Sequence, residues 1–151
     1  TMKQRTEEVI FMTKLTLALA ILLAASGAAL AQDDPPLDCA NAMSQADMNQ
    51  CAYLDFEKAD KELNAVYRDA LKVQAEADTQ AAEMNPAYVG AVKALKKAQR
   101  AWIDYRDGHC EGVGYEAVGG SMQPMLIDGC KARLTETRTK ELRELAEGLE
   151  N

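Results

Sequence analysis

One long apolar repeat, between residues 52 and 71, constrains the fold of this chain more than any other feature. It recurs in steps of four and three residues, the period of an α-helix, and comprises Ala52, Phe56, Ala59, Leu63, Val66, Tyr67, Ala70 and Leu71. No glycine or proline interrupts it before Asn85-Pro86, and Ser44 with Asp47 resembles a capping box upstream. The sequence therefore predicts a helix from about residue 44 to the high 70s.

Two further helices are expected downstream. Asn85-Pro86 is a typical helix start and predicts a second helix that ends near Cys110. Residues 111–124 contain four glycines and predict a long loop. The third helix is predicted to start at Ser121 and Pro124, with an apolar stripe made of Leu126, Cys130, Leu134, Leu142, Leu145 and Leu149. Strand signals are absent, so we expect an all-α fold, a small antiparallel bundle of three to four helices.

The N-terminal region has the features of a secretory signal peptide. Residues 15–31 carry no charge, follow Lys14 and end in the cleavage pattern Ala29-Leu30-Ala31. The alternative is an uncleaved membrane anchor, but the apolar run is short of the roughly 20 residues that a span needs. We expect upstream residues and a signal peptide over 1–31, an extended leader over 32–43, and a single helical domain over 44–151.

Charge and cysteine content restrict the partners and the compartment. The net charge is −7 over the whole chain and −8 over residues 32–151, which disfavours nucleic acid and, after signal cleavage, an anionic membrane. The four cysteines, Cys39, Cys51, Cys110 and Cys130, follow the predicted cleavage site, and an even count in an exported domain predicts two disulfides. We favour the pairs Cys39–Cys51 and Cys110–Cys130 because each closes a short loop. A zinc site is the alternative, but no C-x-x-C occurs, so neither metal nor cofactor is expected.

Several polar or amphipathic side chains lie in phase with the three apolar stripes: Asp60, Asn64, Gln99, Trp102, Arg106 and Arg138. A buried arginine requires a partner, so we expect Arg106 to bind Asp60 in a bidentate manner while its stem covers Trp102. Asn64 and Gln99 would accept hydrogen bonds from the remaining N–H groups of Arg106. The interpretation is a structural polar layer that fixes helix register. A ligand site on the same residues and simple surface exposure are the alternatives.

The quoted segments together resemble a known family. They are Cys39 and Cys51 ahead of "DKELNAVY" (60–67), then "AQRAWIDYRD" (98–107), Cys110, "GGS" (119–121) and Cys130. Over residues 39–145 the chain is similar to the LprI-type lysozyme-inhibitor-like family of exported, mostly helical domains. The namesake is a lipoprotein, whereas this chain lacks the lipid-accepting cysteine. The resemblance implies a periplasmic or secreted protein that binds a basic protein such as lysozyme.

The function expected from the sequence is therefore binding without catalysis. The chain has no H-E-x-x-H, phosphate loop, dinucleotide fingerprint or Ser–His–Asp order. The alternatives to an inhibitor are a structural or interaction protein of the cell envelope and, second, an enzyme that acts on the cell wall. The candidate binding residues are those of the predicted loop between Cys110 and Cys130: Glu111, Tyr115, Glu116 and Ser121. They combine an aromatic anchor with negative charge. Ser121 is also the expected cap of the last helix.

Overall fold

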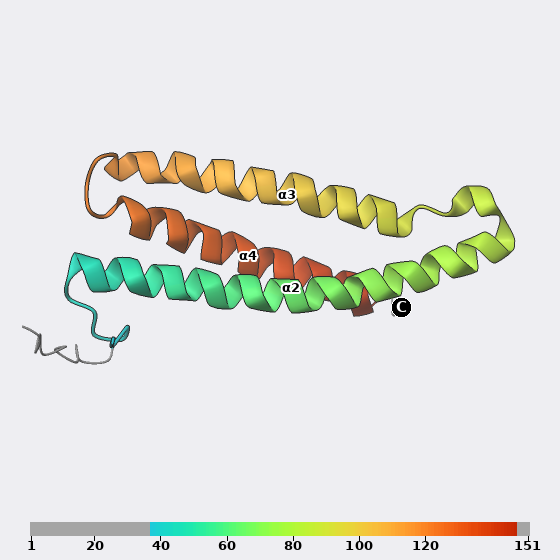
Figure 1. The fold of residues 1–151 in the computed structure, drawn as a ribbon, viewed down its shortest axis with the longest axis horizontal. Coiled ribbons are helices and arrows are strands. Elements are labelled where there is room, and N and C mark those ends of the chain that lie inside the picture. Colours follow the sequence, from blue (N-terminus) through green and yellow to red (C-terminus); the bar gives the residue numbers. More distant parts are fainter. Residues whose placement is uncertain (1–36, 148–151) are drawn as a thin grey trace, which may run out of the picture. The chain divides into compact units, whose positions relative to one another are not determined.

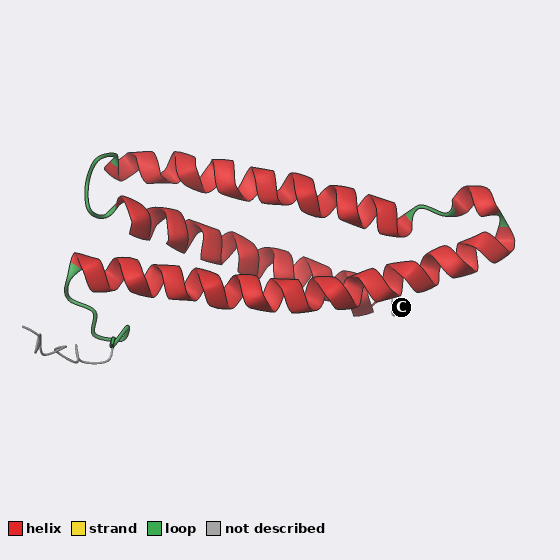
Figure 2. Cartoon of the chain, viewed as in Figure 1, coloured by secondary structure: helices red, strands yellow, loops and turns green. Residues whose placement is uncertain are grey.

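The computed structural model describes residues 37–147, which form three α-helices without a strand among them (Figures 1 and 2). The elements are α2 (Gln45–Met84), the 3₁₀ turn η1 (Pro86–Tyr88), α3 (Ala91–Gly114), the 3₁₀ turn η2 (Tyr115–Ala117) and α4 (Gln123–Glu147). The predicted all-α, antiparallel bundle is confirmed. The predicted signal peptide, and the leader as far as residue 36, lie outside the described residues.

The first helix begins where the sequence predicts. The hydroxyl of Ser44 accepts a hydrogen bond from the amide of Asp47 at 3.0 Å, which satisfies one of the free N–H groups of the first turn. The helix continues to Met84 rather than ending in the high 70s, because residues 79–84 contain no helix breaker. Just before it, the Asp38 carboxylate accepts from the amide of Ala40 at 3.0 Å, so the described end of the leader forms a turn.

The start of α3 differs from the prediction. Asn85 caps only η1, accepting from the amide of Ala87, and α3 begins at Ala91. Asp78 of α2 supplies the missing cap: its carboxylate accepts from the amides of Gly90, Ala91 and Val92 at 2.7, 2.7 and 3.1 Å. These hydrogen bonds lower the pKa of Asp78 below its ordinary value, and the bond from the Gly90 amide has the largest effect. A side chain of α2 thus fixes where α3 starts.

The end of α3 also differs, because the helix passes Cys110 and continues to Gly114. The prediction of a loop from residue 111 is therefore wrong for its first part. Gly114 is buried against α4, where an added Cβ would lie 2.5 Å from Cγ1 of Ile127, so this glycine serves close helix packing rather than a loop. The irregular segment is reduced to residues 118–122, within which Gly119 adopts a φ of 75°.

The core is small and lies among the three helices. Its buried members are Leu63, Ala70, Leu95 and Leu142, with Val66, Tyr67, Leu71, Trp102 and Ala146 packed against them. On α4 the predicted stripe is confirmed at Cys130 and Leu142, but Thr135 and Thr139 are also buried, whereas Leu145 is 40% exposed. Threonine is tolerated there because the Thr139 hydroxyl donates to the Thr135 carbonyl at 2.8 Å within the helix.

Both predicted disulfides are confirmed. Cys39 is bonded to Cys51 and Cys110 to Cys130, which leaves no free cysteine. The first bond ties the segment before α2 to the helix, and the second joins the last turns of α3 to the first turns of α4. Each stabilises a core of this size by about 3 kcal/mol. Among the described helices none is long and apolar enough to cross a membrane.

Candidate functional site

Arg106 lies at the centre of the polar residues identified in the sequence. Its side chain is nearly buried, at 7% exposure for the residue. Nη1 donates to Asp60 Oδ1 at 3.2 Å and to the Thr135 hydroxyl at 3.4 Å, and Nε donates to Asp107 Oδ1 at 2.9 Å. The contact with Asp60 is present but is made through one nitrogen, because Asp107 on the next position of α3 takes the other side of the guanidinium. Asp107 and Thr135 were not anticipated from the sequence.

Two aromatic rings enclose the same guanidinium. Its central carbon lies 5.0 Å from the centroid of Phe56 and 5.2 Å from that of Trp102. Both distances are within the range of cation–π attraction, which strengthens where water is excluded. The expected cover of Trp102 by Arg106 is therefore present, and Phe56 of α2 adds a second ring.

Gln99 and Arg138 form a separate cluster, and neither Gln99 nor Asn64 accepts from Arg106 as predicted. Gln99 is buried and accepts from Nε of Arg138 at 3.2 Å, and Arg138 donates to Glu141 at 2.7 Å. Gln99 cannot reach Arg106 because seven residues of helix separate them, a rise of about 10.5 Å. Asn64 is exposed and instead donates to the Asp60 carboxylate at 2.8 Å, which orients the acceptor of Arg106.

These two clusters have few free groups to offer a ligand. Within residues 37–147 every buried side-chain nitrogen or oxygen has a hydrogen-bond partner. A satisfied polar network between helices specifies their register, whereas a binding site keeps polar groups available. The geometry therefore favours a structural role for the clusters, and we expect a binding partner to contact exposed residues instead.

The candidate binding residues gather at the end of the bundle that holds the Cys110–Cys130 disulfide. We refer to Glu111, Tyr115, Glu116 and Val118 as the acidic tip. All four are exposed, Tyr115 by 62% and Val118 by 64%. Glu111 lies in the last turns of α3 rather than in a loop, and Tyr115 and Glu116 lie in η2. The helical backbone makes these side chains better fixed than the predicted flexible loop would.

Ser121 has a different role from the predicted one. The first backbone bond of α4 runs from the Leu126 amide to the Met122 carbonyl, so Met122 rather than Ser121 occupies the capping position. The carbonyl of Ser121 instead accepts from the side-chain amide of Asn49 at 2.9 Å, which ties the turn to α2. Ser121 therefore helps to position the acidic tip through its backbone.

An aromatic pair extends this surface along α3. Tyr105 and His109, one helical turn apart, stack with ring centroids 5.4 Å apart, and Tyr105 is 56% exposed. The exposed carboxylate of Asp104 precedes them. The exposed surface from Asp104 in α3 to Glu116 in η2 thus combines carboxylates with aromatic rings. The spacing of four residues between Tyr105 and His109 was the available sequence signal for this pair.

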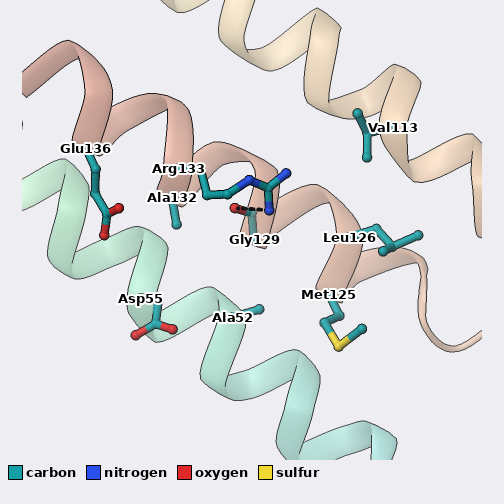
Figure 3. A pocket seen from close by; sticks show the side chains of 9 residues that line it. All are labelled: Ala52, Asp55, Val113, Met125, Leu126, Gly129, Ala132, Arg133 and Glu136. Atoms are coloured by element: carbon teal, nitrogen blue, oxygen red, sulfur yellow. Dashed lines mark hydrogen bonds between the residues drawn. The ribbon is translucent and has the colours of Figure 1, made fainter.

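A shallow groove of about 460 Å³ opens between α2 and α4, close to the end of α3 (Figure 3). Its lining residues are Ala52, Asp55, Val113, Met125, Leu126, Gly129, Ala132, Arg133 and Glu136. Arg133 lies along the groove and donates to the Gly129 carbonyl at 3.1 Å (Figure 3). The groove results from small residues on facing helices. Among the described residues no cluster of three or more His, Cys, Asp or Glu side chains is arranged to hold a metal.

The fold and these surfaces define a class, a small disulfide-linked helical bundle with a paired polar interior and with further charged and aromatic groups exposed at the end of α3. The sequence matches the family described as "Lysozyme inhibitor LprI" over residues 38–142, which contain both disulfides, α2, α3 and most of α4, and the chain belongs to this family. The resemblance seen in the sequence is thereby confirmed.

One relative is similar to the chain over a longer stretch than the family match. The chain is 52% identical over 134 residues to a protein of Rhizobium meliloti (strain 1021) that carries the name "Uncharacterized protein R02472". The aligned region covers 89% of this chain and 96% of that protein. No solved structure matches the chain.

Proposed function

We propose that this chain is an exported inhibitor of lysozyme that acts in the periplasm or outside the cell by binding the enzyme, without catalysis of its own. The observation that carries the proposal is membership of the lysozyme inhibitor family across residues 38–142. The two disulfides support it, because such bonds persist in oxidising compartments.

The acidic tip is the surface that best suits a basic enzyme. Glu111 and Glu116 flank the exposed ring of Tyr115, and tyrosine is a frequent anchor at protein interfaces. The net charge of −8 over residues 32–151 would steer the protein towards a basic partner, with association slowing as salt rises. The adjacent disulfide and the helical backbone reduce the ordering cost of binding.

Inhibition then requires only steric exclusion. Lysozymes bind their polysaccharide substrate in a concave cleft, and in this proposal η2 and the following turn, which carry exposed side chains at one end of the bundle, occupy that cleft. Tyr115 would provide the apolar contact inside the cleft, while the carboxylates of the tip would pair with basic side chains at its rim. No proton transfer or covalent step is assigned to this chain.

The test is a cell-wall lysis assay with a basic lysozyme and the purified protein at low salt. We expect inhibition at micromolar protein, and we expect Tyr115→Ala with Glu116→Lys to weaken it at least about tenfold, the loss of one interface hot spot. The matched control is Tyr88→Ala with Glu83→Lys, since Tyr88 is 66% exposed and Glu83 is also on the surface, at the other end of α3.

The outcomes separate the function from the site. Equal inhibition by both double variants would keep the inhibitor function but remove the acidic tip as its contact surface. No inhibition by the parent protein at micromolar concentration would refute the lysozyme target, and would leave a structural or interaction protein of the envelope.

A further inference from the structure

The helical hairpin at the other end of α3, formed by the last turns of α2, η1 and the first turn of α3, contributes no fully buried side chain to the core. No residue between Leu71 and Ala94 is fully buried, and in Figure 1 the last turns of α2 and η1 extend past the described end of α4. Large apolar side chains are nevertheless exposed there: Met84 by 75%, Tyr88 by 66% and Val89 by 48%. Because the core does not use these side chains, their exposure calls for another explanation.

A strip of positive charge continues from this apolar end along α3. It consists of Lys93, Lys96, Lys97 and Arg100, four exposed residues at helical spacing. Residues 84–103 contain no Asp or Glu, although the domain as a whole is acidic. None of the four cations forms a salt bridge within the described residues. We refer to residues 84–100 as the basic hairpin.

The apolar and basic groups meet in one shallow pocket of about 380 Å³, lined by Asp78, Val89, Gly90, Val92, Lys93, Lys96 and Arg100. Asp78 is the only carboxylate of this lining, and both of its oxygens already accept from the first amides of α3. The nearest further acids along the chain are Glu76, two residues before Asp78, and Asp104, four residues after Arg100, and both are exposed. The pocket therefore presents cations around an apolar floor.

We propose that the basic hairpin docks on the surface of a bilayer that contains anionic phospholipids. Clustered Lys and Arg side chains bind the phosphates of such a surface, and a tyrosine beside them suits the headgroup region. Methionine and valine at the end of the hairpin can enter the boundary with the acyl chains. A soluble polyanion would use the four cations but would leave the exposed Met84, Tyr88 and Val89 without a role, so the bilayer is the favoured partner.

The net negative charge of the domain does not prevent this contact, because the two signs are separated along α3. Glu111, the first carboxylate of the acidic tip, lies eleven residues beyond Arg100, a rise of about 16.5 Å along α3, and Asp104 alone among the exposed carboxylates of this surface lies within one turn of Arg100. The screening length at physiological ionic strength is about 8 Å, so a charged surface near the basic hairpin interacts mainly with the cations of the hairpin and little with more distant carboxylates. Docking by the hairpin would hold the acidic tip away from the membrane, open to a soluble partner.

The test is co-sedimentation of the protein, recovered after export from a bacterial host, with two kinds of vesicle. We expect binding to vesicles of mixed phosphatidylglycerol and phosphatidylcholine, and little binding to phosphatidylcholine alone. The variant Lys96→Gln, Lys97→Gln, Arg100→Gln should bind at least about a hundredfold more weakly, given about fivefold for each cation. Tyr88→Ser with Val89→Ser should also weaken vesicle binding while leaving the charge unchanged.

The matched control changes the net charge equally at other exposed positions, Lys58→Gln, Lys61→Gln and Lys140→Gln, and should retain vesicle binding. Equal losses for the two triple variants would contradict a local site. Binding to both kinds of vesicle alike, or to dextran sulfate but to neither kind, would overturn the anionic bilayer as the partner. If Tyr88→Ser with Val89→Ser bound as well as the parent, the apolar part of the proposal would be refuted.

Discussion

Replacing Arg106 by methionine removes the charge at the centre of the bundle and keeps an unbranched stem against Trp102 and Phe56. The bonds to Asp60 and Asp107 contribute about 0.5–1 kcal/mol each, because the side chains of these two carboxylates are 39% and 47% exposed and therefore screened. Loss of two cation–π contacts adds about 1 kcal/mol, and relief of the desolvation of the guanidinium offsets part of the total. We expect Arg106→Met to destabilise the fold by about 2 kcal/mol, or about 8 °C in Tm.

A double-mutant cycle decides whether the ion pair itself contributes. Asp60→Asn, Arg106→Met and the combined variant should show a coupling free energy of about 0.5–1 kcal/mol in urea unfolding. The control is the pair Asp69–Lys72, which is 2.8 Å apart but has side chains more than 60% exposed, and its coupling should be smaller. If the effects at 60 and 106 are strictly additive, the reasoning that the pair ties α2 to α3 is refuted.

Three further predictions concern the ends of the helices. Asp78→Ala should lower the Tm at neutral pH. Because the pKa of Asp78 is lowered in the fold, its contribution is complete above its ordinary value of 3.8 and is lost as pH falls through the folded pKa, so thermal melts of the two proteins should converge in acid. Gly114→Val should destabilise by about 2 kcal/mol in urea unfolding through its clash with Ile127, and Ile127→Ala should restore part of this. Cys110→Ala with Cys130→Ala should cost about 3 kcal/mol by the same measurement, and thiol titration of the unfolded parent should find no free thiol.

The parts of the fold that could be predicted depend on local signals. Ser44 caps α2 through the amide of Asp47, three residues on, and such a bond is visible in the sequence. The disulfides Cys39–Cys51 and Cys110–Cys130 span 12 and 20 residues. The pairing could therefore be predicted by choosing the cysteines that close the shortest loops. Hydrophobic period placed Arg106 on the buried side of α3, and the cost of an unpaired buried charge identified Asp60 as a partner.

The parts that could not be predicted depend on tertiary contacts. Asn85-Pro86 is a good local start signal, but Asp78, 13 residues before Ala91, decides where α3 begins. Gly114 lies in a glycine-rich stretch that predicts a loop, yet it is the last residue of α3. Only a glycine at this position allows the backbone of α3 to come so close to Ile127 of α4. On α4 the apolar pattern predicted the burial of Cys130 and Leu142, but not that of Thr135, which is buried because its hydroxyl accepts from the guanidinium of Arg106.

Separation of charge along α3 gives the two ends of the domain different chemistry. The first part of α3, with Lys93 to Arg100, is basic and adjoins exposed apolar residues, whereas the surface from Asp104 to Glu116, in the rest of α3 and in η2, is acidic and aromatic. A net charge averages over this distribution and conceals it. The proposed membrane contact and the proposed enzyme contact therefore do not compete for one surface.

Hydrogen–deuterium exchange of the protein with and without a basic lysozyme tests the central claim most directly. If the chain is a lysozyme inhibitor that binds through the acidic tip, peptides covering residues 104–122 should gain protection in the complex, while those covering the basic hairpin should exchange as before. Protection confined to the basic hairpin would contradict the assigned surface. Unchanged exchange throughout, at concentrations of lysozyme well above micromolar, would contradict the inhibitor function itself.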